Sequence, residues 1–174
     1  MTSLILLFVC MALLCIVPTV LYRCPFDFMI VFYKYMAALP NARKLYRKLL
    51  LIVLLLFHLI YISAIPREYG IFVSTLAFAV FYRFMDVDRW LHCLNENWKL
   101  SWAFGITSVV VVFIPHMIPL AVTMAVVLQA SHFYPSYRII QEFKDPDMLV
   151  RLKNNRRLLV TRYYDVSPEE CHKK

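Results

Sequence analysis

Histidine and cysteine are the residue types in this chain with the widest chemical repertoire, and one histidine has an unusual setting. His58 stands near the end of the run LLLIVLLLFHLI, whose other members are all apolar. An ionisable side chain in such a run is by default a functional candidate, as a proton relay, a ligand contact or a metal ligand. A neutral imidazole that hydrogen-bonds a neighbouring helix explains it as well. We expect the structural role for His58 and keep the functional role as the alternative.

The other histidines and the cysteines do not complete a metal site. Zinc needs ligands at about 2 Å, but the topology inferred below puts His58, His116 and His132 at mid-membrane, outer face and inner face. The odd number of cysteines gives no disulfide framework, and no two of them have metal-ligand spacing. They are Cys10, Cys15, Cys24, Cys93 and Cys171. Cys24, just past the first apolar run, has a juxtamembrane acylation site as its alternative role.

Motifs for catalysis are missing from the sequence. There is no GxSxG elbow, no HExxH pair and no phosphate-binding glycine loop, and the chain holds only 2 glycines. The apolar runs contain no carboxylate that could exchange protons with His58. We therefore expect a protein that is not an enzyme and that needs no cofactor or metal.

The composition is that of a membrane protein. Of the 174 residues, 61% are hydrophobic and 17% are charged, and the mean hydropathy is +0.64, well above a soluble domain. Four stretches lack Asp, Glu, Lys and Arg for about the 17–25 residues of a bilayer crossing. They are residues 2–22, 49–66, 69–82 and 100–137. None alternates like a barrel strand, so we expect an all-α integral membrane protein with the first run retained as a span.

The motif FIPHMIP, residues 113–119, decides the topology. It is either a kink in one span or a turn between two spans. If it is a turn, 18 of the 19 basic residues share one side of the membrane and Arg67 alone lies on the other. Basic residues concentrate in cytoplasmic loops, and two prolines suit a helix end followed by a helix start. We therefore expect about five spans with the N-terminus outside and the C-terminus inside. Their approximate bounds are 3–22, 49–66, 69–84, 100–116 and 117–134.

Two segments between the spans are expected to lie in the membrane interface. Residues 25–40 are apolar, but a Lys at mid-bilayer costs about 2.5–3.5 kcal/mol, so Lys34 favours an interfacial helix over a sixth span. Asn41 after Pro40 is expected to cap the next helix.

The second interfacial segment is residues 88–99, where Asp88 is expected to cap a short helix. Trp90, Leu94, Trp98 and Trp102 recur every four residues, which predicts one helix face. Tryptophans at a span boundary are typical interfacial anchors.

Small residues indicate where the spans pack. Lipid gives helices no hydrophobic reason to associate, so close contact relies on small side chains. Such residues recur at helical spacing in the last three spans: Gly70, Ser74, Ala77, Ser101, Gly105, Ser108, Ala121 and Ala125. We expect these three spans to form the core, with the first two more peripheral.

The segment 135–174 has the character of a basic cytosolic tail. Asp145 is expected to cap a short helix, and RRLLVTRYY alternates weakly like a strand, with a hairpin across LVRLKNNRRLLV equally possible. Its basic residues are expected to dock a protein partner or anionic lipid headgroups: Arg151, Lys153, Arg156, Arg157 and Arg162. Interspersed acidic residues argue against nucleic acid.

The expected function is that of a non-enzymatic accessory membrane protein whose tail recruits a partner. Subunits of secretion or conjugation machinery, exclusion or immunity proteins, and membrane sensors of defence systems share this build. The alternative is a small channel or transporter subunit that forms a pore as a homo-oligomer. A bacterial inner membrane is the expected location.

Overall fold

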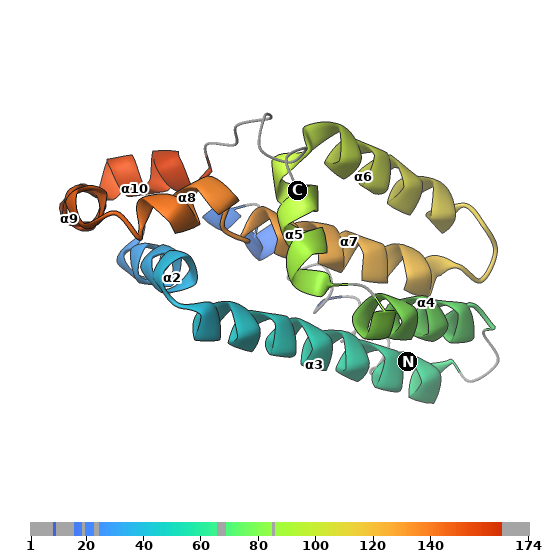
Figure 1. Cartoon of the computed structure of the whole chain (residues 1–174). Coiled ribbons are helices and arrows are strands. Elements are labelled where there is room, and N and C mark those ends of the chain that lie inside the picture. Colours follow the sequence, from blue (N-terminus) through green and yellow to red (C-terminus); the bar gives the residue numbers. More distant parts are fainter. Residues whose placement is uncertain are drawn as a thin grey trace.

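The computed structural model describes residues 9, 16–18, 20–22, 25–65, 69–84 and 86–164. Within them the chain forms nine helices and no strand, which confirms the all-α prediction (Figure 1). The helices are α2 (Asp27–Ala38), α3 (Pro40–Ala64), α4 (Gly70–Phe84), α5 (Val87–Glu96), α6 (Trp98–Val112), α7 (Ile118–His132), α8 (Tyr137–Glu142), α9 (Pro146–Asn154) and α10 (Arg156–Tyr163). Most of the predicted first span, Arg67 and the last ten residues lie outside the described residues, as do Cys10, Cys15, Cys24 and Cys171.

Two of these elements are long and apolar enough to cross a membrane. They are α3 and the 25-residue element Ile118–Glu142, in which α8 continues α7. The pair α4 and α5 would make a third only if counted as one span, because the two helices meet at 100°. Helix α6 is apolar but shorter, with 15 residues.

The long helices run beside one another, and α7 lies at their centre. It packs against α3, α4, α5 and α6. Helix α6 ends at Val112 and α7 begins at Ile118, and the two helices lie side by side, so FIPHMIP is a turn and not a kink. The end of α3, the start of α4 and the α6–α7 turn lie at the same end of the bundle, which we call the turn end (Figure 1).

Two of the expected helix caps differ in the structure. Pro40 occupies the first turn of α3, and Asn41 makes no cap there because the helix has already begun, with Leu39 as its N-cap. In α5 the cap is Asp86, whose carboxylate accepts from the Asp88 amide. The prediction that Asp88 caps this helix is therefore wrong, and its side chain is available for other contacts.

The predicted single face of tryptophans is also wrong. Asn97 both ends α5 and caps α6 through its side chain, which accepts from the Leu100 amide. The helix axis therefore changes direction between Leu94 and Trp98. Leu94 is fully buried, whereas Trp98 and Trp102 are 65% exposed.

The tail folds back onto the chain as helices, so the predicted strand or hairpin is wrong. Asp145 caps α9 as expected, and Asn155 caps α10. Helix α10 packs against α2 and α9, and α2 packs against α8. We call α2 with α8, α9 and α10 the tail module. Its buried side is rich in fully enclosed large side chains: Tyr33, Leu152, Leu159 and Tyr163.

Candidate functional site

His58 belongs to a buried chain of hydrogen bonds that joins three helices. Its Nδ1 lies 2.7 Å from the Leu54 carbonyl oxygen, one turn back in α3. Its Nε2 lies 2.8 Å from the Ser74 hydroxyl in α4, which lies 2.9 Å from the Thr123 hydroxyl in α7. Thr123 in turn donates to the Pro119 carbonyl oxygen at 2.8 Å. We call His58, Ser74 and Thr123 the histidine chain; each is at most 5% exposed.

The hydrogen atoms of this chain can be counted. A carbonyl oxygen only accepts, so the Leu54 contact requires the proton of a neutral imidazole to sit on Nδ1. Nε2 then accepts from Ser74. The four contacts need four hydrogens, but a neutral imidazole and two hydroxyls supply three. Thr123 must therefore divide its one hydroxyl proton between Ser74 and Pro119.

The chemistry available to the histidine chain is limited. No Asp or Glu occurs in α3, α4, α6 or α7, so a proton on His58 would have no carboxylate to pass to within these helices. The histidine chain does stabilise the packing of these helices, because hydrogen bonds between membrane helices contribute about 0.6 kcal/mol each on average. The histidine chain fastens α3 and α4 to α7.

The turn end is closed by a very close backbone approach. A Cβ atom on Gly70 would lie 1.5 Å from the His116 carbonyl oxygen, so only glycine fits. His116 itself has φ of 64° and is exposed. Gly70 was predicted from the sequence to be a helix-packing residue. The backbone that it approaches is that of His116, in the turn between α6 and α7.

The small residues of α6 contact the neighbouring helices in different ways. A Cβ on Gly105 would lie 3.3 Å from the Leu128 side chain, and the Ser108 hydroxyl donates to the Ala121 carbonyl oxygen at 2.9 Å. Ser101 donates to the Leu94 carbonyl oxygen of α5.

Two members of the small-residue set are not covered by a neighbouring helix. Ala77 on α4 is exposed and lines a cavity between α4, α5, α6 and α7. Ala125 on α7 is half-buried and lines a groove along α6.

A second polar cluster lies at the other end of the bundle. Asp88 on α5 accepts a hydrogen bond from the Tyr134 hydroxyl. The guanidinium of Arg47 in α3 lies 3.8 Å from the same carboxylate, and His92 Nε2 lies 3.9 Å from its other oxygen. We call these four residues the Asp88 hub. It joins α3 and α5 to the segment that leads from α7 into the tail.

His92 is the most buried group of the Asp88 hub. It is 1% exposed, stacks on Tyr137 with ring centroids 4.1 Å apart, and meets Tyr134 edge-on at 4.7 Å. Burial lowers the pKa of His92 to about 4, although the Asp88 carboxylate raises it in part. His92 is therefore neutral at pH 7.

Sequence reasoning missed this hub, although a signal was present. Asp88, His92 and Glu96 are spaced four residues apart, so they line one face of a helix. Glu96 accepts a hydrogen bond from the Tyr137 amide at 2.7 Å, at the start of α8. A polar face of this kind in a short helix beside a span predicts a polar partner across from it.

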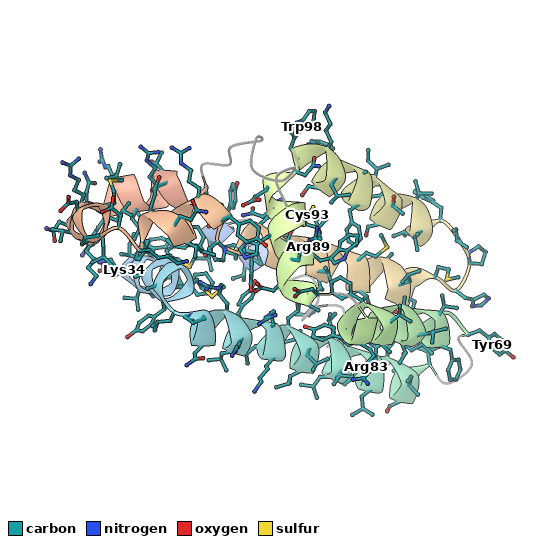
Figure 2. The ribbon with its side chains drawn as sticks, in the orientation of Figure 1. Lys34, Tyr69, Arg83, Arg89, Cys93 and Trp98 are labelled. Atoms are coloured by element: carbon teal, nitrogen blue, oxygen red, sulfur yellow. The ribbon has the colours of Figure 1, made fainter. Side chains whose placement is uncertain are left out.

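The five basic tail residues do not share one environment. Arg151, Lys153 and Arg157 are exposed. Arg156 pairs with Asp27 of α2, and Arg162 is half-buried with its guanidinium 3.6 Å from Glu142. Figure 2 shows Lys34 of α2 beside this surface, where its ammonium donates to the Lys153 carbonyl oxygen at 3.1 Å.

The remaining candidates do not meet in one place. His132 Nδ1 lies 2.7 Å from the Leu128 carbonyl oxygen of its own helix, and Cys93 on α5 is half-buried. Within the part of the chain that the structure describes, no three His, Cys, Asp or Glu side chains are grouped to hold a metal ion. Trp90 is half-buried and packs edge-on against Phe81.

Comparison with known proteins gives no relative. No protein-family model, no curated protein and no solved structure matches this chain.

Proposed function

We propose that this protein is a non-enzymatic accessory protein located in a bacterial inner membrane, and that its tail module docks a cytosolic protein partner. In this proposal the chain crosses the membrane five times, with the N-terminus outside and the C-terminus inside. Secretion or conjugation machinery, exclusion or immunity, and membrane sensing in defence are the processes that use subunits of this build.

The distribution of charge along the bundle supports the topology. Tyr69 marks the turn end in Figure 2, and Lys34, Arg83 and Arg89 lie away from it. The turn between α6 and α7 carries no basic residue. Because basic residues favour the cytoplasmic side, the turn end is assigned to the outside and the tail module to the inside.

Helix length sets a condition on this topology. Helices α4 and α6 have 15 residues each, which at 1.5 Å per residue is about 22 Å, against about 30 Å of hydrocarbon in a typical bilayer. A short span is accommodated by local thinning of the bilayer at modest cost. The five-crossing proposal therefore implies a bilayer that is thinner around this protein.

The observation that carries the docking proposal is the folded tail module. A frayed basic tail would be explained as a topology signal alone. Here α8 and α10 instead pack against α2, and Leu152, Leu159 and Tyr163 are fully buried, which leaves Arg151, Lys153 and Arg157 on a fixed outer surface. Fixed charges on a folded surface lose less conformational freedom when a partner binds.

The topology is tested by labelling single cysteines with a membrane-impermeant maleimide. One variant keeps Cys171 and has its other cysteines replaced by serine; a second has Phe113→Cys as its only cysteine. Phe113 is 81% exposed in the α6–α7 turn. We expect Phe113→Cys to label in intact spheroplasts and Cys171 only after permeabilisation. Labelling of Cys171 in intact spheroplasts would place the tail outside and remove the cytosolic partner.

Docking is tested by charge removal, because deleting the tail would also uncover Tyr33 and confuse docking with folding. Arg151, Lys153 and Arg157 are changed together to glutamine, and the protein is purified gently from native membranes. We expect a stoichiometric partner to be retained by the parent chain and lost from this variant.

The matched control for docking removes three charges elsewhere. Lys44, Lys48 and Lys99 are exposed residues outside the tail module, and changing them to glutamine should leave the partner bound. Equal retention by both triple variants would exclude the basic surface as the docking site. A parent chain that purifies only as a homo-oligomer would favour a channel subunit instead.

A further inference from the structure

Positive charge is concentrated where α9 ends and α10 begins. Helix α9 ends at Asn154 and α10 begins at Arg156, and four basic residues lie among the seven residues 151–157 around this junction. Seven residues that are mostly helical extend over about 10 Å, which is about one Debye length in physiological salt, so these charges act on a ligand together. We call the four exposed side chains the basic surface: Arg151, Lys153, Arg156 and Arg157.

Three of these four cations are not balanced by a neighbouring carboxylate. Arg156 pairs with Asp27 of α2. Among the residues that the structure describes, no ion pair involves the other three. The acidic residues at the start of α9, Asp145 and Asp147, lie at the opposite end of that helix, where the Asp145 carboxylate accepts from the Asp147 amide as the cap. The basic surface therefore carries unmatched positive charge.

Helix stability explains the positions of two of these cations but not that of Arg157. Arg151 and Lys153 lie in the last turn of α9, where the helix dipole favours positive charge. Arg157 lies in the first turn of α10, which holds no acidic residue, and the dipole disfavours positive charge there. Arg157 therefore lowers the stability of α10, and contact with a negatively charged partner accounts for its position.

An apolar side chain lies beside the basic surface. Asp27 pairs with Arg156, and the Lys34 ammonium donates to the Lys153 carbonyl oxygen at 3.1 Å, so this face of α2 meets α9 and α10. Val31 lies four residues after Asp27 and three before Lys34, which puts it on the same helix face. It is nevertheless 51% exposed. A partner that covers Val31 gains an apolar contact, which matters because exposed ion pairs alone contribute little.

In the proposed topology the basic surface faces the cytosol and not the lipid headgroups. Helix α9 lies at the end of the molecule opposite the turn end, farther from the turn end than α2 and α3 (Figure 1). The attraction of anionic headgroups for basic residues falls off within about one Debye length. A soluble ligand therefore matches this position better than the membrane surface does.

We propose that the basic surface binds an acidic segment of a cytosolic protein, whose carboxylates pair with Arg151, Lys153 and Arg157 and whose apolar side chain covers Val31. The inference rests on the proposed docking of a partner at the tail module, and it adds the chemistry by which that partner is recognised. Arginine binds carboxylates with two parallel hydrogen bonds. A nucleic acid is a poorer match, because its regularly spaced phosphates would also run past Asp147 at the other end of α9.

The ligand chemistry is tested with two fluorescein-labelled peptides and the full-length protein in neutral detergent. One short peptide contains glutamate and leucine, and the other has glutamine in place of each glutamate. Fluorescence anisotropy at physiological salt concentration gives the two dissociation constants. We expect the parent chain to bind the glutamate peptide, and to bind the glutamine peptide about tenfold or more weakly.

Removal of charge from the basic surface should weaken this binding. Arg151, Lys153 and Arg157 are changed together to glutamine. Because each exposed ion pair contributes up to about fivefold, we expect the dissociation constant to rise by about tenfold to a hundredfold. The binding constant should also depend less steeply on salt concentration. The matched control is the triple lysine-to-glutamine variant used above to test docking, which should bind the glutamate peptide as the parent chain does.

Two single substitutions separate binding from folding. Arg157→Glu puts a negative charge in the first turn of α10, which the helix dipole favours. The denaturant midpoint should therefore not fall, while binding of the glutamate peptide should weaken more than in Arg157→Gln. Val31→Ser removes the apolar contact, and should weaken binding without changing its salt dependence.

Equal binding of the glutamate peptide to the parent chain and to the triple variant of the basic surface would overturn the proposal. A single-stranded oligonucleotide, or phosphatidylglycerol in the same detergent, that binds more tightly than the glutamate peptide would do so too, by assigning the charges to nucleic acid or to lipid. Co-purification from native membranes separates this failure from that of docking itself. A partner that is lost from the triple variant, together with a glutamate peptide that does not bind, rejects the acidic chemistry and leaves the docking proposal standing.

Discussion

The two ends of the helix bundle are held together by different chemistry. At the turn end, glycine and uncharged hydrogen-bonding groups make the contacts: Gly70 against the His116 backbone, and His58 with Ser74 and Thr123. At the other end, the Asp88 hub uses a carboxylate, a guanidinium and buried aromatic rings. The difference follows the surroundings, because an ionised group is costly in hydrocarbon and affordable at an interface with water.

This contrast predicts different sensitivities for the two ends. The turn end depends on shape, so that added volume should damage it while moderate acid should not. The hub end depends on protonation, so that acid should damage it while small changes of volume nearby are tolerated better. The following variants test this division, from the largest expected effect to the smallest.

The largest effect is expected for Gly70→Ala. The new Cβ would meet the His116 carbonyl oxygen at 1.5 Å, and a backbone atom cannot move aside as a side chain can. We expect a loss of about 3 kcal/mol or more in the free energy of unfolding, measured in mixed micelles by denaturant titration. Gly105→Ala is the matched control, because its Cβ would lie 3.3 Å from a Leu128 methyl group that can shift. Similar losses in both variants would show that the turn end is not specially constrained.

The second effect is acid sensitivity through His92. Its pKa is lowered to about 4 in the folded protein, below about 6.5 for an unperturbed histidine. The unfolded chain therefore binds more protons between these values, and stability falls as the pH drops from about 6.5 to about 4. The loss should approach about 3 kcal/mol, measured as unfolding free energy across that range.

His92→Phe isolates this effect from other titrating groups. Phenylalanine keeps a ring against Tyr137 and Tyr134 but takes up no proton. The variant should lose most of the pH dependence between 6.5 and 4, while carboxylates continue to titrate below it. An unchanged pH profile would show that His92 is not the group responsible.

The arrangement of the helices was largely available from the sequence. Apolar runs free of charge locate α3, α4, α6 and α7, because the cost of charge in hydrocarbon leaves a direct record in composition. Prolines marked the start of α3 and the turn before α7, because proline fixes φ and lacks an amide donor. The strand predicted for RRLLVTRYY was wrong because this segment forms α10, which is stabilised by packing against α2, a contact between distant segments.

The residues of the candidate site could be predicted from the sequence only in part. His58 stood out because of its setting, and Ser74 because of its small size, but their contact depends on how α3 and α4 are aligned relative to α7. Such alignment is a three-body property that no local pattern encodes. The cap of α5 was predicted two residues too late, at Asp88, since Asp86 and Asp88 have the same local chemistry and only the observed helix start distinguishes them.

The third effect is a coupling between His58 and Ser74. Ser74→Ala removes a group that contacts both His58 and Thr123, and His58→Leu removes the other member of the pair. In a double-mutant cycle we expect a coupling of about 1 kcal/mol, within the range of hydrogen bonds between membrane helices. Additive losses would mean that the two side chains act independently and that the histidine chain does not fasten α3 to α4.

The smallest effect is expected for the pair of Arg156 and Asp27 on the outer surface of the tail module. The two side chains are 63% and 80% exposed, and exposed ion pairs contribute from nothing to about 1 kcal/mol. A double-mutant cycle of Arg156→Gln and Asp27→Asn should give a coupling below about 0.5 kcal/mol. A coupling energy well above that would show that this ion pair contributes to the stability of the folded protein, as the Asp88 hub does.

A small coupling energy between Arg156 and Asp27 makes it possible to separate an effect on partner docking from an effect on folding. If Arg156→Gln leaves the unfolding free energy unchanged but weakens retention of a partner, the loss belongs to the interface and not to folding. Asp27→Asn then serves as the control, because it breaks the same ion pair yet leaves the basic surface intact. Loss of the partner in both variants would instead indicate that the partner needs α2 and α10 held together, which assigns recognition to the shape of the tail module and not to its charge.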